Sequence, residues 1–291
     1  MTGFEEAAAA ALGFDSIEAV PAGGGSINRG WRIVTPEGDV FFAKSRTGGD
    51  PAEFANEAAG LRWLAEPGAV RIPEVIAIIE DAEEPGLVLE WVDDGGRADE
   101  TELGRALALV HQAGADAFDR LPPGASGDEI RFGDATIPLS PAPPDHGFGR
   151  AYGNRLRHLA ALAFDSGALE LSDRTAIEDV ADRAEHLAGP PEPPARIHGD
   201  LWSGNLMWTR SGPCLVDPAA HGGHREIDLA MLELFGGPGP GFYSSYGEVA
   251  PLADGLRERL PFWQIQPLLV HAILFGGGWG TAAGRAARRY L

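Results

Sequence analysis

The sequence predicts an α+β chain of two lobes, with a strand-rich N-terminal lobe over residues 1–92 and a helical C-terminal lobe over 93–291. Short apolar runs separated by Gly, Asp and Pro turns fill the first ninety residues, with one helical pattern among them. From Thr101 onward apolar residues recur at helical spacing, as in E-L-G-R-A-L-A-L-V-H-Q. The length of 291 residues allows two lobes, and the apolar content of 44% is that of a globular protein.

The N-terminal lobe is expected to hold several short strands, namely W-R-I-V, V-F-F-A-K, R-I-P-E-V-I-A-I and G-L-V-L-E-W-V. The glycine run G-G-G-S-I-N-R-G, residues 23–30, precedes W-R-I-V and lies between two candidate strands. A linker is expected near residues 92–97. A Pro- and Gly-rich segment at about 119–149 interrupts the helices, so we expect a long loop or flap there.

Composition excludes some classes of partner. The formal net charge of −20 argues against nucleic acid and anionic membrane, so local cations and backbone donors must hold any anionic ligand. Cys214 is the sole cysteine, which rules out an intramolecular disulfide and favours a cytoplasmic protein. The first dozen residues contain Glu5 and Glu6 and no basic segment, so no secretory signal is expected. The longest apolar run, L-L-V-H-A-I-L-F, is too short to span a membrane.

Lys44 is the only lysine among 23 Lys and Arg residues. Biased codon usage would explain this, and so would a site that needs a compact ammonium. The helix predicted after it begins at the N-cap Asp50 and has an apolar face that includes Phe54 and Leu61. Glu57 lies on the same face. An inward carboxylate needs a cation, and Lys44 is the nearest one in sequence, unless Glu57 reaches solvent at the helix edge.

The segment I-H-G-D-L-W-S-G-N-L-M-W, residues 197–208, is followed by C-L-V-D-P-A at 214–219. Asp200 and Asn205 are spaced as in a kinase catalytic loop, H-x-D-x-x-x-x-N, and Asp217 follows the next strand as a second metal-binding Asp does. A carboxylate such as Asp200 accepts the proton of an attacking hydroxyl. Asn205 and Asp217 supply the hard oxygen ligands that two Mg²⁺ ions need. The pattern therefore predicts phosphoryl transfer from ATP.

With these motifs the chain resembles the fructosamine (ketosamine) 3-kinases, a branch of the aminoglycoside-phosphotransferase group. That group has a protein-kinase-like two-lobed fold with an antiparallel-sheet N-lobe and a helical C-lobe. The resemblance covers almost the whole chain and is carried by G-G-S-I-N, E-x-x-G-L after Lys44, L-V-L-E-W, H-G-D-L-W-S-G-N, D-P-A-x-x-G-G-H-R-E-x-D-L-A-M, L-F-G-G and L-L-V-H-x-x-L-F-G-G-G. D-L-W-S-G-N together with G-G-H-R-E is its most specific part.

The resemblance implies that Lys44 contacts the ATP phosphates and that Glu57 holds Lys44 in place. It also implies a loop over the phosphates, a hinge whose main chain binds adenine, and an apolar floor. The loop residues are Gly23, Gly24, Gly25, Ser26 and Asn28, the hinge residues are Glu90, Trp91 and Val92, and the floor is Met207. A glycine run by itself is more often a flexible turn.

The resemblance also suggests substrate contacts. Trp202 would stack on the sugar, unless it only packs in the core. His224 and Arg225 would grip substrate or phosphate, unless they form a loop ion pair with Glu226. Two further residues are expected to be structural: His198 would orient the catalytic loop, and Asp228 would brace it through backbone hydrogen bonds.

The central segment departs from the family pattern. Relatives carry N-[FY]-I-G-x-x-x-Q-x-N followed by a Trp, whereas this chain has A-T-I-P-L-S-P-A-P-P, which leaves the substrate open. Ser26 stands where some relatives have a reactive Cys, so no thiol switch is expected there.

The function implied is an ATP- and Mg²⁺-dependent kinase for the 3-hydroxyl of small or protein-bound sugar–amine adducts, such as fructosamines and ribulosamines. Phosphate at C3 is next to the C2 carbonyl and β to the amine-bearing C1, so its elimination followed by hydrolysis would free the amine, a deglycation. We expect a monomer or weak dimer.

One alternative is a kinase for another hydroxylated amine, such as an aminoglycoside or choline. Another is a nucleotide-binding pseudokinase, although neither base nor metal ligand is lost. A protein kinase is disfavoured because no A-P-E-like segment follows Asp217.

Overall fold

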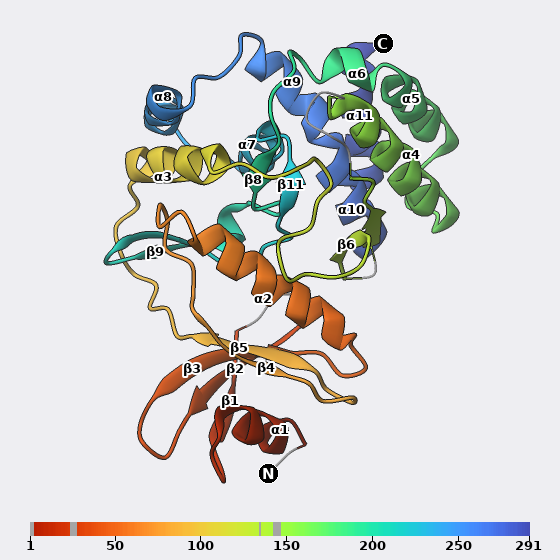
Figure 1. The fold of residues 1–291 in the computed structure, drawn as a ribbon. Helices are drawn as coiled ribbons and strands as arrows, with labels where there is room; N and C mark the ends of the chain where they lie inside the picture. The colour runs from red at the N-terminus through yellow and green to blue at the C-terminus, as the bar shows by residue number, and fades with distance from the viewer. Residues whose placement is uncertain (1–2, 24–27, 134, 142–146) are drawn as a thin grey trace.

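The computed structural model describes residues 3–23, 28–133, 135–141 and 147–291, and all statements below concern these residues. It has a mixed α+β fold in which a five-stranded antiparallel sheet is followed by a mostly helical part (Figure 1). The predicted fold class, a kinase-like sheet lobe with a helical lobe after it, is confirmed. Residues 91–99 contain no helix or strand. The expected division between residues 92 and 93 stays a prediction.

The sheet has the order β1-β2-β3-β5-β4, with every neighbouring pair antiparallel. Its strands are β1 (Glu18–Ala22), β2 (Arg29–Val34), β3 (Val40–Ser45), β4 (Val75–Ile79) and β5 (Gly86–Glu90). In the register between β3 and β5, Lys44 is opposite Leu87 and Ala43 is opposite Val88. Because side chains alternate along a strand, Lys44 and Ala43 face opposite sides of the sheet.

A helix covers each face of this sheet. Helix α1 (Gly3–Leu12) packs on the face that carries Ala43 and Val88, where Phe4 stacks on Trp31. The sequence predicted one helix in this lobe, so α1 is an addition; its run of five alanines has the highest helix propensity of any residue type. Helix α2 (Pro51–Ala65) packs on the other face and begins, as predicted, at the N-cap Asp50.

The C-terminal part is built from helices and three two-stranded ribbons. The helices are α3 (Glu100–Gln112), α4 (Gly149–Asp165), α5 (Leu171–Asp182), α6 (Ala184–Leu187), α7 (Glu226–Leu234), α8 (Pro240–Val249), α9 (Leu256–Trp263), α10 (Ile265–Phe275) and α11 (Trp279–Ala287), with short 3₁₀ turns η2 (Ser203–Asn205) and η3 (Arg288–Tyr290). The ribbons pair β6 (Glu129–Phe132) with β7 (Ala135–Pro138), β8 (Ala195–Ile197) with β11 (His221–Gly223), and β9 (Leu206–Thr209) with β10 (Gly212–Leu215). None of the described helices has the length and apolar character needed to cross a bilayer.

One apolar core joins α2 and β5 to the helical part. It contains Phe54 and Leu61 of α2, Leu87 and Leu89 of β5, and continues into α3, α4 and α10. Helix α2 therefore lies between the sheet and the helical part, and Figure 1 shows it crossing above the sheet. This position places one side of α2 at the boundary between the lobes.

The segment at 119–149 is not the long loop that its Pro and Gly content suggested. It contains the hairpin β6–β7, in which Ile130 is paired with Ile137 and both side chains are buried. The alternation of apolar residues in E-I-R-F and A-T-I-P supports strands. Gly133, at the turn, has a φ of 59°, a conformation that glycine adopts without strain.

The helical part contains a buried ion pair that we expect to be important for stability. Asp119 and Arg155 of α4 are hydrogen-bonded, with side chains 2% and 1% exposed. Asp119→Asn keeps the shape but leaves the buried guanidinium without its counter-charge. We expect a loss of about 3 kcal/mol in the free energy of unfolding, measured by urea denaturation.

A matched control lies on the same helix. Arg150 pairs with Glu185 at 3.3 Å, and these side chains are 79% and 66% exposed. Glu185→Gln should change stability by less than about 1 kcal/mol, because exposed pairs contribute little. Equal stability losses in the two variants would show that burial does not determine the effect of the Asp119 pair.

Candidate active site

The catalytic loop predicted from H-G-D-L-W-S-G-N is anchored by hydrogen bonds to Asp228 of α7. Its carboxylate accepts hydrogen bonds from the backbone N–H groups of His198, at 2.7 Å, and Gly199, at 2.8 Å, and lies 3.1 Å from Nε2 of His111. Burial alone would raise the pKa of Asp228, but the contacts with His111 and His198 hold it below its usual range. The hydrogen bonds expected of Asp228 are thus confirmed.

Two further features fix the shape of this loop. Gly199 has a φ of 82°, and a Cβ there would lie 2.3 Å from the carbonyl oxygen of Ala219, so no larger residue fits without rearrangement. His198 bonds through Nε2 to the carbonyl of Val216 at 2.9 Å, and its Nδ1 accepts from the N–H of Asp200 at 3.3 Å. Burial lowers the pKa of His198, so the ring is neutral. These contacts fit the expected orienting role.

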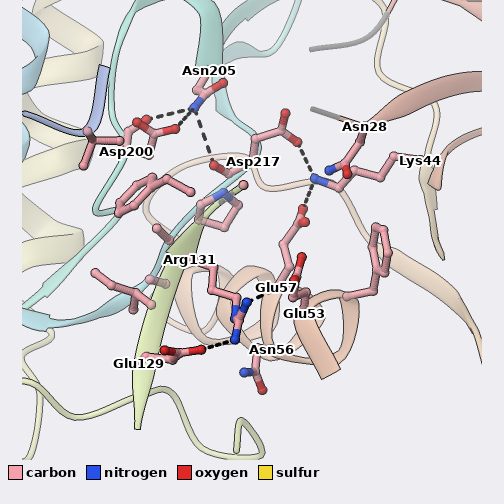
Figure 2. Close-up of a pocket in the computed structure, with 18 of the residues that line it drawn as sticks. Asn28, Lys44, Glu53, Asn56, Glu57, Glu129, Arg131, Asp200, Asn205 and Asp217 are labelled. Carbon is pink, nitrogen blue, oxygen red and sulfur yellow. Dashed lines mark hydrogen bonds and ion pairs between the residues drawn. The ribbon is translucent and has the colours of Figure 1, made fainter. Parts of the chain in front are cut away.

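The loop brings Asp200, Asn205 and Asp217 together (Figure 2). Nδ2 of Asn205 donates to Oδ2 of Asp200 at 3.0 Å and to its carbonyl oxygen at 2.9 Å, which turns the amide oxygen away from Asp200. Burial raises the pKa of Asp200 to about 7, and the nearby Asp217 and Asp228 carboxylates add to the shift although the Asn205 hydrogen bond opposes it. Asp200 therefore binds a proton more readily than Asp217 does.

Lys44 joins this loop to the sheet lobe. It is 5% exposed, forms an ion pair with Glu57 of α2, and donates to Oδ1 of Asp217 at 2.7 Å. Burial alone would lower the pKa of Lys44, but the Glu57 and Asp217 carboxylates raise it, so the ammonium stays charged. Glu57 faces inward and is paired with Lys44, as predicted, instead of reaching solvent at the helix edge.

The backbone at Asp217 has an unusual conformation. Its φ is 55°, in the left-handed region, which costs a residue other than glycine on the order of 1–3 kcal/mol. Asp is among the residues that tolerate it best. The turn directs the carboxylate toward Lys44, and the burial that would raise the pKa of Asp217 is outweighed by the Lys44 charge, which lowers it. Asp217 therefore remains anionic.

The donor set fits a cation that arrives with a phosphate. Among the described residues, no group of three or more His, Cys, Asp or Glu side chains could hold a metal ion. Asp217 and Asn205 offer one carboxylate and one amide oxygen, and Mg²⁺ in phosphotransfer sites commonly completes its shell with phosphate oxygens and water. Oδ1 of Asn28 is buried, has no hydrogen-bond partner among the described residues and belongs to a residue of the pocket wall, which fits a group that contacts bound ligand.

Not every nucleotide-binding candidate lines the cavity of about 720 Å³ that contains these residues. Asn28, Lys44 and Glu57 do. Of the glycine loop, Gly24, Gly25 and Ser26 lie outside the described residues, and Gly23 is not in the pocket wall. The hinge residues Glu90, Trp91 and Val92 and the floor residue Met207 are not in that wall either.

The hinge candidates nevertheless lie beside the ribbon that carries Met207. The N–H of Gly95 donates to the carbonyl of Trp208 at 3.0 Å, and Trp208 N–H donates to Asp94 at 3.2 Å. Glu90 is paired with Arg71 at 2.5 Å. These contacts place the linker along β9, but the adenine-binding roles stay predictions.

An aromatic wall forms the acceptor side of the pocket. Trp202 is 37% exposed and its ring centroid lies 5.5 Å from that of Phe235, so it is not simply a core residue. Phe235 and Trp279 both contact His271, and Phe275 is 52% exposed at the pocket. Apart from Trp202, sequence reasoning missed this wall. The spacing of His271 and Phe275, four residues apart on one helix, was the available signal.

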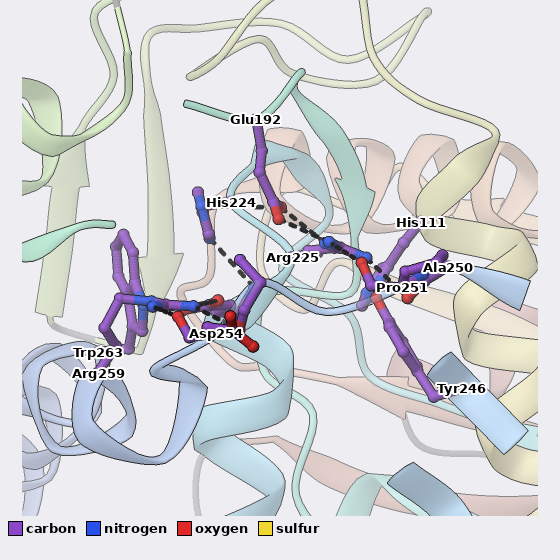
Figure 3. A network of polar contacts seen from close by, with 12 residues as sticks. His111, Glu192, His224, Arg225, Tyr246, Ala250, Pro251, Asp254, Arg259 and Trp263 are labelled. Atoms are coloured by element: carbon purple, nitrogen blue, oxygen red, sulfur yellow. Dashed lines mark hydrogen bonds and ion pairs between the residues drawn. The ribbon is translucent and has the colours of Figure 1, made fainter. Parts of the chain in front are cut away.

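His224 and Arg225 lie in a different environment, shown in Figure 3. Arg225 forms two hydrogen bonds of 2.6 Å with Glu192 and two more with backbone carbonyls. His224 is 4% exposed and stacks on Trp263 at 4.7 Å. Neither lines the pocket, so we propose no substrate role for them. The alternative, a loop ion pair, is present, but its partner is Glu192 and not Glu226.

Glu226 has its own buried partners. It accepts hydrogen bonds from Arg259, at 2.9 and 2.5 Å, and from Nε1 of Trp263, at 2.8 Å. Its side chain is 1% exposed. The G-G-H-R-E motif therefore ties the start of α7 to α9 and to the loop at Glu192, and supports the helix that carries Asp228.

Comparisons with known proteins agree with this geometry. The sequence profile described as fructosamine kinase matches residues 5–120 and 151–291. A probable ketoamine kinase of Thermus thermophilus is 35% identical over 273 residues, covering 92% of each chain. The chloroplastic protein-ribulosamine 3-kinase of Arabidopsis thaliana is 32% identical over 278 residues, covering 92% of this chain and 81% of the plant protein. The crystal structure of a proposed fructosamine-3-kinase from Thermobifida fusca superposes with a TM-score of 0.84 at 36% identity, covering 99% of each chain. The chain therefore belongs to the fructosamine kinase family of phosphotransferases.

Proposed function

We propose that this chain transfers the γ-phosphate of ATP, with Mg²⁺, to the 3-hydroxyl of ketosamines, the sugar–amine adducts of the fructosamine and ribulosamine type. The observation that carries the proposal is the convergence of Lys44, Asp200, Asn205 and Asp217 on one pocket. The names of the Thermus and Arabidopsis relatives support the acceptor class.

Each residue has a defined task in this reaction. Asp200 accepts the proton of the attacking hydroxyl while the new P–O bond forms and the bond to the leaving ADP breaks. Lys44 contacts the phosphates and keeps its partner Glu57. Asn205 and Asp217 would hold Mg²⁺, which when bound would neutralise charge on the phosphate oxygens. A ligand at Asp217 would also release the Lys44 ammonium, 2.7 Å away, for its phosphate contact.

The aromatic wall suits the acceptor. A sugar presents C–H groups on one face and hydroxyls at its edge, and the exposed Trp202 with Phe235 offers an apolar surface beside Asp200. Phosphate placed on C3 of a ketosamine is next to the C2 carbonyl and β to the amine-bearing C1. Loss of a proton from C1 gives an enaminol that can expel the C3 phosphate, and water then hydrolyses the resulting imine to the free amine, which would make the reaction a deglycation.

A second acceptor class has specific support. The family profile does not match residues 121–150, and this segment supplies Ile130, Arg131 and Phe132 to the pocket. A different wall can select a different amine, such as an aminoglycoside or choline. A panel of fructosyl-lysine, ribulosyl-lysine, an aminoglycoside and choline, with ADP release as the readout, decides between them. ADP release with ketosamines alone supports the proposal, and its restriction to another amine overturns it.

Asp200→Ala should abolish transfer and leave nucleotide binding nearly intact, because Asp200 contacts the acceptor hydroxyl and not ATP. Loss of a proton acceptor of this kind typically reduces the rate by on the order of 10²–10⁴. Steady-state turnover and the Kd for MgATP measure the two effects separately. Asp116→Ala, at an exposed position outside the pocket wall, is the control. Wild-type turnover in purified Asp200→Ala would refute the assignment.

Asp217→Asn should lose most activity and weaken MgATP binding, since a neutral amide replaces an anionic metal ligand. Asn205→Ala should bind MgATP more normally but still react slowly. The measurement is the Mg²⁺ dependence of turnover at fixed ATP. An identical Mg²⁺ dependence in wild type and Asp217→Asn would contradict the metal role.

Lys44→Arg should fail although it keeps the charge, because the longer planar guanidinium must satisfy its donors in a buried space that holds an ammonium between Glu57 and Asp217. Glu57→Gln should reduce kcat/KM for ATP less than Lys44→Met does, and the two losses should not add. Single and double variants measure this. If Lys44→Arg matches wild type, the lone lysine reflects codon usage.

A further inference from the structure

Helix α2 carries Glu57. From the helical side, the described residues of the segment 121–138, which includes the hairpin β6–β7, contact the first half of α2. The fructosamine kinase profile matches on both sides of residues 121–150 but not within them. The contacts between this segment and α2 therefore do not follow from the family match. They come from this chain's own residues.

The strongest contact is a two-point hydrogen bond at Asn56, the residue before Glu57. Its Nδ2 donates to the carbonyl of Ser126 at 2.8 Å, and the N–H of Ser126 donates back to Oδ1 at 2.9 Å. Because both ends of one planar amide are engaged by one residue, the contact fixes distance and orientation together. In Figure 2, Asn56 lies on α2 below Glu57, beside Arg131 of β6.

A second contact is electrostatic and lies one turn earlier on α2. Glu53 pairs with Arg46, just past the end of β3, and its other oxygen lies 3.9 Å from Nη1 of Arg131. Arg131 is also paired with Glu129. The Glu53 carboxylate is therefore shared between a cation next to the sheet and a cation of the hairpin.

The other half of α2 has separate anchors. A Cβ at Gly60 would lie 3.1 Å from Cβ of Ala220, so the helix approaches the segment after Asp217 closely at that point. At the C-terminal end, Arg196 donates to the carbonyl of Trp63 and pairs with Glu66 at 2.8 Å. Among the described residues, the half of α2 before Glu57 thus has its polar contacts to the helical side through Asn56 and Glu53.

The Lys44 ammonium contacts two carboxylates, and the position of α2 determines whether Glu57 is one of them. It contacts Asp217 at 2.7 Å as well as Glu57. If the first half of α2 moved outward, Glu57 would leave, and the ammonium would remain on Asp217. That contact would compete with a metal ion for the Asp217 carboxylate.

We propose that the segment 121–138 acts as a clamp on α2 and that Asn56 is a positioning residue, which acts through Glu57 to keep Lys44 available to the nucleotide phosphates. This proposal rests on the proposed phosphoryl transfer. Asn56, Arg131, Glu57 and Asp200 all line one pocket, so the clamp borders the same cavity as the catalytic loop.

The test is a double-mutant cycle of Asn56→Ala with Glu57→Gln, read as the Kd for MgATP by calorimetry and as kcat/KM for MgATP with an active acceptor. Asn56→Ala alone should raise the Kd for MgATP and lower kcat/KM for MgATP, each by about tenfold. In the Glu57→Gln background the same change should have less than a twofold effect, because the residue through which Asn56 acts is already disabled. Asn56→Asp keeps an oxygen that accepts the hydrogen bond from Ser126 N–H. This variant should therefore recover part of the MgATP affinity and activity that Asn56→Ala loses.

The control is Asn154→Ala, which removes an exposed asparagine of α4 outside the pocket wall and should match wild type. Urea unfolding midpoints, compared among all variants, separate positioning from stability. Asn56→Ala with wild-type Kd, or with the same loss in both backgrounds, overturns the proposal. Since the Kd needs no acceptor, a wild type that ignores ketosamines but shows the expected cycle would refute the proposed acceptor and support the clamp.

Discussion

The active site depends on one buried ammonium shared by two carboxylates from different parts of the chain. Lys44 comes from β3, Glu57 from α2 and Asp217 from the turn after β10. A charge that is 5% exposed is costly to bury unless its partners are in place, so the three elements must be positioned together. The sheet register that sets Lys44 opposite Leu87 and the left-handed backbone at Asp217 both serve this arrangement.

The same constraint explains the residue types around it. Asp228 holds the catalytic loop through two backbone N–H groups, so the loop does not depend on the ligand for its shape. Asp217 is kept ionised by Lys44, whereas burial raises the pKa of Asp200 to about 7, which makes it the better proton acceptor. Asp200 and Asp217 thus differ in basicity through their neighbours, although both are aspartates.

The sequence predicted those site residues that lie close to one another along the chain. Asp200 and Asn205 occupy one loop, and Glu57 follows Lys44 within one strand and helix, so motif and helical face were sufficient. The aromatic wall at Phe235 and His271, and the contact of Asn56 with Ser126, join residues far apart in sequence and appear only in the fold. The hairpin β6–β7 was hidden by Pro and Gly content that indicates loops. The division into a strand-rich and a helical part followed from periodicity, which averages over many residues, whereas the kinase-like fold was implied by the family resemblance.

The central segment links acceptor choice to catalytic geometry. Residues 121–138 supply Ile130, Arg131 and Phe132 to the pocket and also bind α2 through Ser126 and Arg131. A change in this segment that alters the acceptor wall would therefore also act on the helix that carries Glu57. If this segment selects the acceptor, acceptor specificity and the position of α2 are, for this physical reason, not independent properties of the chain.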